Sequence, residues 1–244
     1  MTTAARKRFV VAVLSAAALC CSLARAHDLI TAEAAERYLT LAAENRKIIR
    51  SKAAAAQRAQ ASYAQGVMLD EIRDLLNRDI ASHGRVQGLP SEYLVATLAA
   101  QGTPLATTPG SVRLPANLDY YRESLRLAPD GPSAPDAALR LLQGYFYDSF
   151  SDDPLTPHAQ SWAQLQQQIR AGERFQQRYP THPGREEVDF IVAVHYLQAA
   201  RAAPDARERQ GYSQRARAAL SAFQQRYPDS MRVAAVEVLM EQIP

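Results

Sequence analysis

The chain has 244 residues, a formal net charge of +3 at pH 7 and two cysteines. Residues 1–26 contain four of the basic residues, both cysteines and no acidic residue. Without this segment the net charge is −1, so the clustered positive surface that nucleic-acid binding requires is not expected. The rest of the chain has no thiol, which excludes disulfides and thiolate metal sites.

The N-terminal segment has the features of a cleavable signal peptide. Residues 6–8 are Arg-Lys-Arg, and residues 24–26 (Ala-Arg-Ala) give the small-x-small pattern that signal peptidase requires. The uncharged apolar run between them has 16 residues, fewer than the roughly 20 that a membrane-spanning helix needs. We therefore expect cleavage after Ala26, an exported, periplasmic protein that starts at His27, and no integral membrane segment. A retained anchor and lipid attachment at Cys20 are the alternatives.

Three helices are predicted in the first half of the chain. Residues 31–50 and 53–80 each place apolar side chains on one face at the helical period, so these two helices are expected to pair as a hairpin. Glycine and proline residues between positions 84 and 90 interrupt the pattern. Ser91 is a candidate N-cap for a short helix that ends near Ala100.

The stretch from Gly102 to Pro115 contains three prolines and two glycines and is predicted to be a loop. It is a linker or a partner-binding loop, and it separates residues 27–112, which fit no recognised family, from a second region at 113–244. Shorter helices are expected in that region at 117–128, 134–149, 158–179, 185–202, 206–227 and 230–242. The strand-like run at 188–194 lies within a helical pattern, so the fold is predicted to be all-α.

Part of the second region is an internal repeat. Residues 175–180 and 223–228 both have the sequence Phe-Gln-Gln-Arg-Tyr-Pro, and residues 124–129 form a weaker copy. Upstream, Leu-x-x-Gly-x-x-Tyr at 141–147 matches Phe-x-x-Ala-x-x-Tyr at 190–196. The small residue permits two helices to approach, and the proline ends the second helix of each pair. Such helix pairs are expected to stack into a short solenoid.

These motifs resemble the tetratricopeptide repeat over about residues 117–242. Residues 121–129 and 216–228 are similar to the end of that family's second helix, and the upstream small residue and tyrosine are similar to its first helix. The phrase Phe-x-x-Arg-Tyr-Pro is most similar to the cell-envelope branch, which includes the lipoprotein of the β-barrel assembly machinery. The period differs, since it is 48–49 residues here and 34 in the family.

The resemblance also has two local departures, because Gln168 and Gly172 do not match the family's second-helix positions and the anchoring cysteine is missing. It implies a non-catalytic scaffold that binds a protein or peptide partner along a groove of first-helix residues. Cell-envelope assembly or maintenance is the process expected from the envelope branch. The groove residues expected from this resemblance are Tyr145, Asp148, Val194 and Gln198.

The sequence also bears on whether the chain is an enzyme. No glycine-rich phosphate loop, Gly-x-Ser-x-Gly elbow or His-Glu-x-x-His helix occurs in the sequence, so we expect no cofactor and no catalytic residue. The alternative function is small-molecule or metal handling, because His27 at a cleaved N-terminus pairs an α-amine with an imidazole and Asp28 follows it. Asp148, Asp152 and Asp153 lack the pattern of a calcium loop and are interpreted as a solvated helix end.

Overall fold

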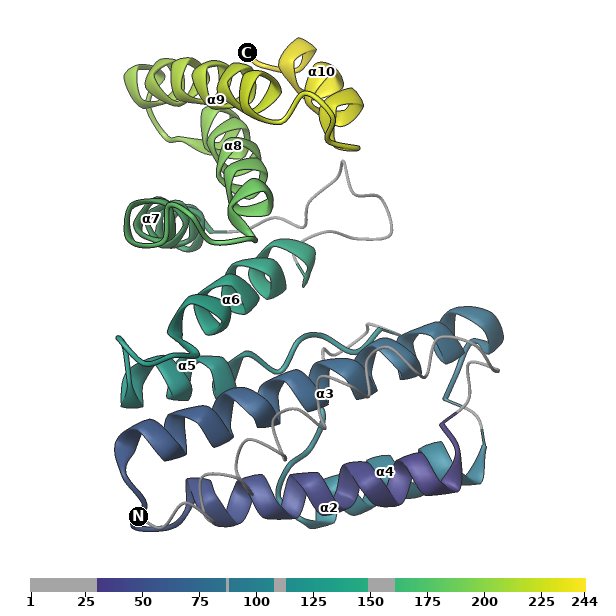
Figure 1. The fold of residues 1–244 in the computed structure, drawn as a ribbon. Coiled ribbons are helices and arrows are strands. Elements are labelled where there is room, and N and C mark those ends of the chain that lie inside the picture. Colours follow the sequence, from purple (N-terminus) through teal and green to yellow (C-terminus); the bar gives the residue numbers. More distant parts are fainter. Residues whose placement is uncertain (1–29, 87, 108–112, 149–160) are drawn as a thin grey trace. The chain divides into compact units, whose positions relative to one another are not determined.

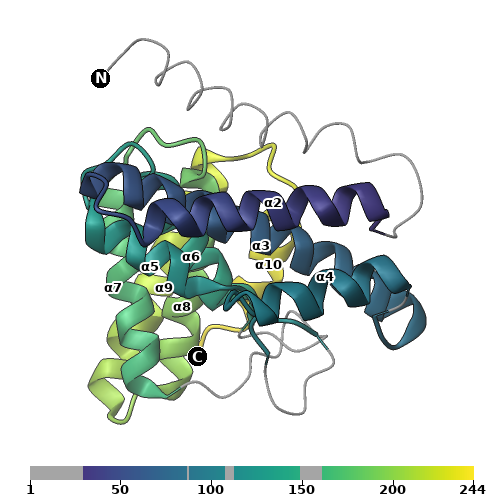
Figure 2. The same ribbon diagram turned by 90° about the horizontal axis from the view of Figure 1, so that it is seen from below.

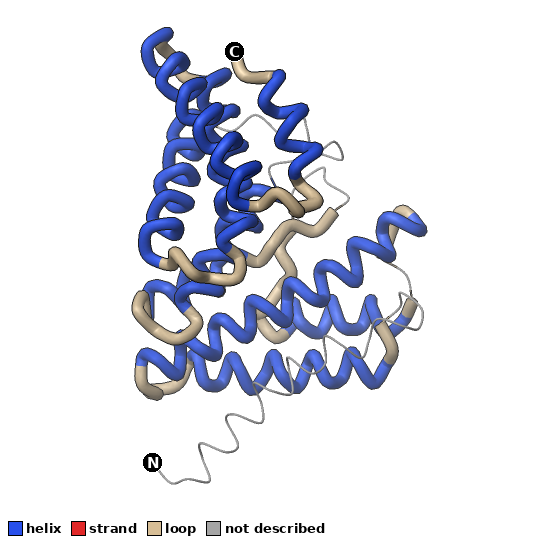
Figure 3. Tube along the Cα trace, turned by 45° about the horizontal axis from the view of Figure 1, so that its top comes forward, coloured by secondary structure: helices blue, strands red, loops and turns tan. Residues whose placement is uncertain are grey.

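The computed structural model describes residues 30–86, 88–107, 113–148 and 161–244, and within these ranges the chain is helix and loop without strands (Figures 1 and 3). The prediction of an all-α fold is therefore confirmed. The helices in the described ranges are α2 (Ala32–Ile49), α3 (Ala55–His83), α4 (Leu89–Ala100), α5 (Leu118–Leu127), α6 (Ala134–Asp148), α7 (Trp162–Arg178), α8 (Arg185–Ala202), α9 (Ala206–Arg226) and α10 (Val233–Glu241). None of them is long and apolar enough to cross a membrane.

Several sequence predictions concern residues outside the described ranges. They are the signal peptide at 1–26, the N-terminal pair His27 and Asp28, and the acidic residues Asp152 and Asp153. The signal peptide, the metal site at the N-terminus and the solvated acidic turn all stay predictions.

The helix positions agree with the sequence analysis to within a few residues, and the run at 188–194 is helical within α8. The start of α4 is an exception. Ser91 was expected to cap this helix, but α4 begins at Leu89 and Ser91 is buried within its first turn, so that prediction is wrong. Pro90 explains the difference, because a proline in the first turn of a helix gives up only an N–H that has no helical partner.

The first compact unit extends to Ala134 and is built around α3. One side of α3 carries the apolar residues Leu69, Ile72 and Leu76, which are buried in a core that α2 and α4 also supply. Figures 1 and 2 show α2 and α4 together on this side of α3. The expected pairing of the first two long helices is therefore confirmed, with α4 as a third member of the bundle.

The helix α5 packs on the other side of α3 (Figure 1). Its Tyr121 ring lies against Gly66, where an added Cβ would come within 2.8 Å of a ring carbon. The Tyr121 hydroxyl donates a hydrogen bond of 2.5 Å to the buried carboxylate of Asp70. A close backbone approach and a buried polar contact thus hold α5 on α3.

The loop before α5 is also attached to α3. The side-chain amide of Asn77 accepts a hydrogen bond from the Leu114 N–H at 2.8 Å and donates one to the Leu114 carbonyl at 2.9 Å. The sequence predicts a boundary between residues 112 and 113, whereas the compact units divide after Ala134. The physical reason is that the loop and α5 both pack on α3.

The second compact unit begins at Pro135 and contains most of α6 together with α7 to α10. Figure 1 shows α8 between α7 and α9, with α10 packed on α9. Gly172 of α7 permits a close approach to α8, because a Cβ at this position would overlap the side chain of Val192. Ten of the 18 residues of α8 are buried, so this helix forms the centre of the unit.

The three motifs that end at Pro129, Pro180 and Pro228 adopt the same backbone turn. The residue before each proline donates its N–H to the carbonyl four residues earlier, and its ψ angle is 76°, 58° and 59° respectively. Two more backbone hydrogen bonds follow at matching positions in each turn, and all nine are 2.9–3.2 Å long. The repeated sequence therefore corresponds to a repeated helix–turn–helix geometry.

Side chains of the last two turns repeat as well. His182 and Ser230 occupy matching positions, and each accepts a hydrogen bond from the backbone N–H two residues later. His182 Nε2 lies 3.1 Å from Asp136 in the first turn of α6, and the Ser230 hydroxyl donates to Glu186 in the first turn of α8 at 2.7 Å. Each turn is thus bonded to the start of the preceding first helix.

Candidate partner-binding face

Glu187 joins α6 to α8 on one side of the second unit. Its carboxylate accepts hydrogen bonds from Gln143 Nε2 at 2.6 Å and from the Tyr147 hydroxyl at 2.7 Å, and both donors belong to α6. Burial and the bond to Glu187 raise the pKa of Tyr147, so its hydroxyl stays a neutral donor at physiological pH. Two successive first helices of the repeat are therefore connected through one carboxylate.

Arg232, in the turn before α10, extends this network. Its guanidinium lies 3.5 Å from Glu186 and 3.6 Å from Glu187, and 5.6 Å from the centre of the Phe190 ring. This last distance is within the range of a cation–π contact. We call the surface formed by these side chains the first-helix face; it consists of Gln143, Tyr147, Glu186, Glu187, Phe190 and Arg232.

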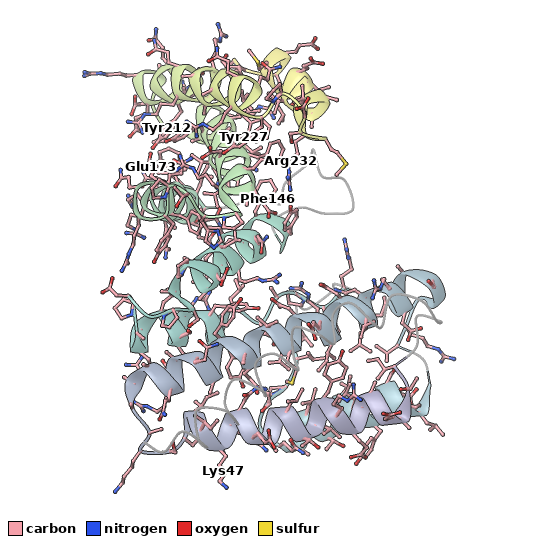
Figure 4. All side chains as sticks on the ribbon, in the orientation of Figure 1. Lys47, Phe146, Glu173, Tyr212, Tyr227 and Arg232 are labelled. Carbon is pink, nitrogen blue, oxygen red and sulfur yellow. The ribbon has the colours of Figure 1, made fainter. Side chains whose placement is uncertain are left out.

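Part of the first-helix face is open to solvent. Tyr147 is 53% exposed, and Met231, the neighbour of Arg232, is 100% exposed. Phe146 is buried and packs edge-on against Phe190, with 6.2 Å between ring centres. Figure 4 shows Phe146 and Arg232 on the same side of α8. The face thus combines the exposed Tyr147 with partly buried charged groups, and the exposed Met231 and the buried Phe146 lie beside it.

The groove residues predicted from sequence occupy different environments. Val194 is 5% exposed and packs in the core of the unit with Phe223, so it contributes to stability and not to the surface. Tyr145 is partly buried on α6, and Gln198 is partly buried with its Nε2 atom enclosed and without a hydrogen-bond partner. Asp148 is the last residue of α6, and its side chain lies outside the described part of the structure.

Gln143, Glu187 and Arg232 are not among the groove residues predicted from the sequence. Glu187 is 40 positions from Tyr147 and 45 from Arg232, so no local pattern connects them. The tyrosine of the upstream motif was the available signal, because Tyr147 belongs to that motif and its hydroxyl binds Glu187. The network around Glu187 therefore depends on the tertiary fold, which brings residues of α6, α8 and the turn before α10 together.

A closed polar cluster lies among α7, α8 and α9. The buried carboxylate of Asp189 accepts hydrogen bonds from Gln176 at 2.8 Å, Arg185 at 2.6 Å, Arg226 at 2.6 Å and Tyr227 at 3.0 Å. Four donors match the acceptor capacity of a carboxylate. This cluster is therefore a structural connection, with no acceptor position left for a ligand.

His195 is the most deeply buried ionisable group on α8. Its ring packs edge-on against Phe146 at 5.6 Å, and neither ring nitrogen has a hydrogen-bond partner. Burial lowers the pKa of His195 to about 4, so the ring is neutral at pH 7. Within the described residues no group of three or more His, Cys, Asp or Glu side chains is arranged to hold a metal ion.

Comparisons with known proteins found no similar protein. The chain matches no family model, no curated protein and no solved structure. Its function must therefore be inferred from the repeat geometry and from the side chains of the first-helix face.

Proposed function

We propose that this chain is a non-catalytic helical-repeat scaffold that binds a protein or peptide partner along the first-helix face. The observation that carries the proposal is the network centred on Glu187, which connects α6, α8 and the turn before α10 into one continuous surface. This surface spans two successive helix pairs, because α6 belongs to one pair and α8 to the next.

The composition of the face supports the same function. Tyrosine, arginine, methionine and phenylalanine are enriched at the centres of protein–protein interfaces. Tyr147, Met231 and Arg232 supply these residue types at or beside the face. Hydrogen bonds and the ring contact hold Tyr147 and Arg232 in place before a partner arrives, which lowers the entropy lost on binding.

The proposed location is the cell envelope. It rests on the basic residues 6–8, the apolar run that follows and the cleavage pattern before His27. The resemblance to envelope tetratricopeptide proteins supports a task in envelope assembly or maintenance, because their partner-binding groove is lined by first-helix residues. In this proposal the mature, exported protein acts as an adaptor that holds a partner.

The proposal is tested by capture of envelope proteins on the immobilised mature protein, followed by mass spectrometry. A Tyr147→Ala/Met231→Ala double variant is compared with Gln214→Ala, a change at an exposed position on α9. We expect the double variant to lose a reproducible partner by at least tenfold and the control to keep it, with equal helicity in both. Equal recovery of the partner by the unchanged protein, the double variant and Gln214→Ala would show that the first-helix face does not bind it.

A further inference from the structure

A second cluster, away from the first-helix face, gathers aromatic rings around a cation. Arg215 of α9 lies 5.5 Å from the centre of the Tyr212 ring and 5.9 Å from that of Tyr196. Trp162, the first residue of α7, packs edge-on against Tyr212 at 5.6 Å. The carboxylate of Glu173 completes the cluster, and Figure 4 shows Glu173 and Tyr212 on the α7 and α9 side of the second unit.

The geometry matches what proteins use to bind organic cations. The faces of aromatic rings carry partial negative charge and attract weakly hydrated cations such as guanidinium or methylated ammonium within about 6 Å. Glu173 adds a full negative charge, and the Tyr196 hydroxyl donates to its Oε1 atom at 2.7 Å. This hydrogen bond fixes the orientation of the carboxylate beside the rings.

Arg215 is held loosely in this cluster. Its side chain is 59% exposed, and its guanidinium lies 3.8 Å from Glu173 Oε1, beyond hydrogen-bond distance. By contrast, Arg226 is hydrogen-bonded to Asp189 at 2.6 Å in the closed cluster nearby. Both contacts of Glu173 within the described residues use Oε1, so its Oε2 atom keeps acceptor capacity for another donor.

We propose that Trp162, Tyr196, Tyr212 and Glu173 form a binding site for an organic cation, and that Arg215 is an internal occupant which the ligand displaces. The ligand carries a guanidinium or alkylammonium group, either on a peptide side chain or as a free small amine. The site goes beyond the proposed scaffold function, because its residues are separate from those of the first-helix face.

Trp162 gives a direct readout, since it is the only tryptophan in the chain. The full mature protein is titrated with tetramethylammonium and with arginine amide at constant ionic strength, with sodium chloride as the reference, while Trp162 fluorescence is recorded. Removal of the occupant in Arg215→Ala is expected to give saturable binding at least tenfold tighter than in the unchanged protein. Arg217→Ala, which removes an exposed arginine from the same helix, is expected to behave like the unchanged protein.

Two further measurements complete the test. Adding Glu173→Gln to Arg215→Ala is expected to weaken binding at least tenfold, with unchanged helicity. An arginine-containing pentapeptide that binds tenfold more tightly than arginine amide would identify a peptide as the source, and equal affinities would identify a free amine. A fluorescence response in Arg215→Ala that does not saturate, or that sodium reproduces, would overturn the site while leaving the first-helix face untouched.

Discussion

The guanidinium of Arg226 lies 2.6 Å from the carboxylate of Asp189, which connects the end of α9 to the start of α8. Arg226 belongs to the second copy of the Phe-Gln-Gln-Arg-Tyr-Pro motif, and Tyr227 of the same copy donates to Asp189 at 3.0 Å. Gln176 of the first copy binds the same carboxylate at 2.8 Å. A single buried acid therefore joins both copies of the repeated sequence.

Replacing this acid is expected to destabilise the protein. In Asp189→Asn the charge that Arg185 and Arg226 share is lost. Because the Arg226 side chain is 54% exposed, solvent screens part of this interaction, and the loss of unfolding free energy is about 1–2 kcal/mol. Asp229→Asn, at an exposed position, is the matched control and should change stability by less than about 0.5 kcal/mol. Urea unfolding followed by circular dichroism measures both, and similar stabilities for the two variants would contradict a structural role for Asp189.

Two glycine substitutions should act in opposite directions. In Gly172→Ala the new methyl group overlaps Val192 on α8, and overpacking of this kind costs about 1–3 kcal/mol. Gly211 lies within α9 with nothing within 4 Å of an added Cβ, so Gly211→Ala should stabilise the protein by about 0.5–1 kcal/mol. The melting temperature should fall in Gly172→Ala and rise in Gly211→Ala, and a rise in Gly172→Ala as well would contradict a close approach of α7 and α8 at Gly172.

His195 should make the protein sensitive to acid. Its pKa is lowered from 6.5 to about 4 in the folded state, so the unfolded chain takes up this proton first as the pH falls. The contribution of the neutral His195 ring to the unfolding free energy is fully present above pH 6.5. This contribution, about 3 kcal/mol, is lost as the pH falls from 6.5 to about 4. Urea unfolding at pH 7 and pH 4 should show a smaller loss in His195→Leu than in the unchanged protein. Equal losses would mean that His195 is not buried and neutral.

The loop before α5 should depend on Asn77. Asn77→Ala removes two hydrogen bonds to the backbone of Leu114, a loss of about 2 kcal/mol. Hydrogen exchange at the Leu114 amide should become faster, while the buried core amide of Leu69 in α3 keeps its slow exchange. Unchanged exchange at Leu114 would mean that the loop is held by other contacts.

Much of the fold could be predicted from local patterns. The helical period of apolar residues and the glycine and proline interruptions gave the helices of the described ranges to within a few residues. The boundary between the compact units could not be predicted this way, because it depends on Tyr121 packing against Gly66 on α3. Composition identifies the loop at 102–115 but does not show which helix the loop and α5 pack against.

The candidate site was harder to predict than the helices, because it depends on contacts between helices. The partners of Glu187 come from helices that are far apart in sequence, so their pairing depends on how the helices are placed. Gly172 was taken as a departure from the family pattern, yet it is the position where α7 and α8 come close. Val194 was expected at the surface, but α8 is enclosed by its neighbours and the side chain lies in the core.

The central claim is that the first-helix face binds a protein partner, and site-specific photocrosslinking tests it most directly. A photoreactive residue is placed at position 147 or 231 of the mature protein, and at the exposed positions 214 and 217 of α9 as controls. After irradiation in cells, positions 147 and 231 are predicted to crosslink to the same envelope protein and the α9 positions are not. Crosslinks from α9 alone, or none from positions 147 and 231, would contradict the proposed function.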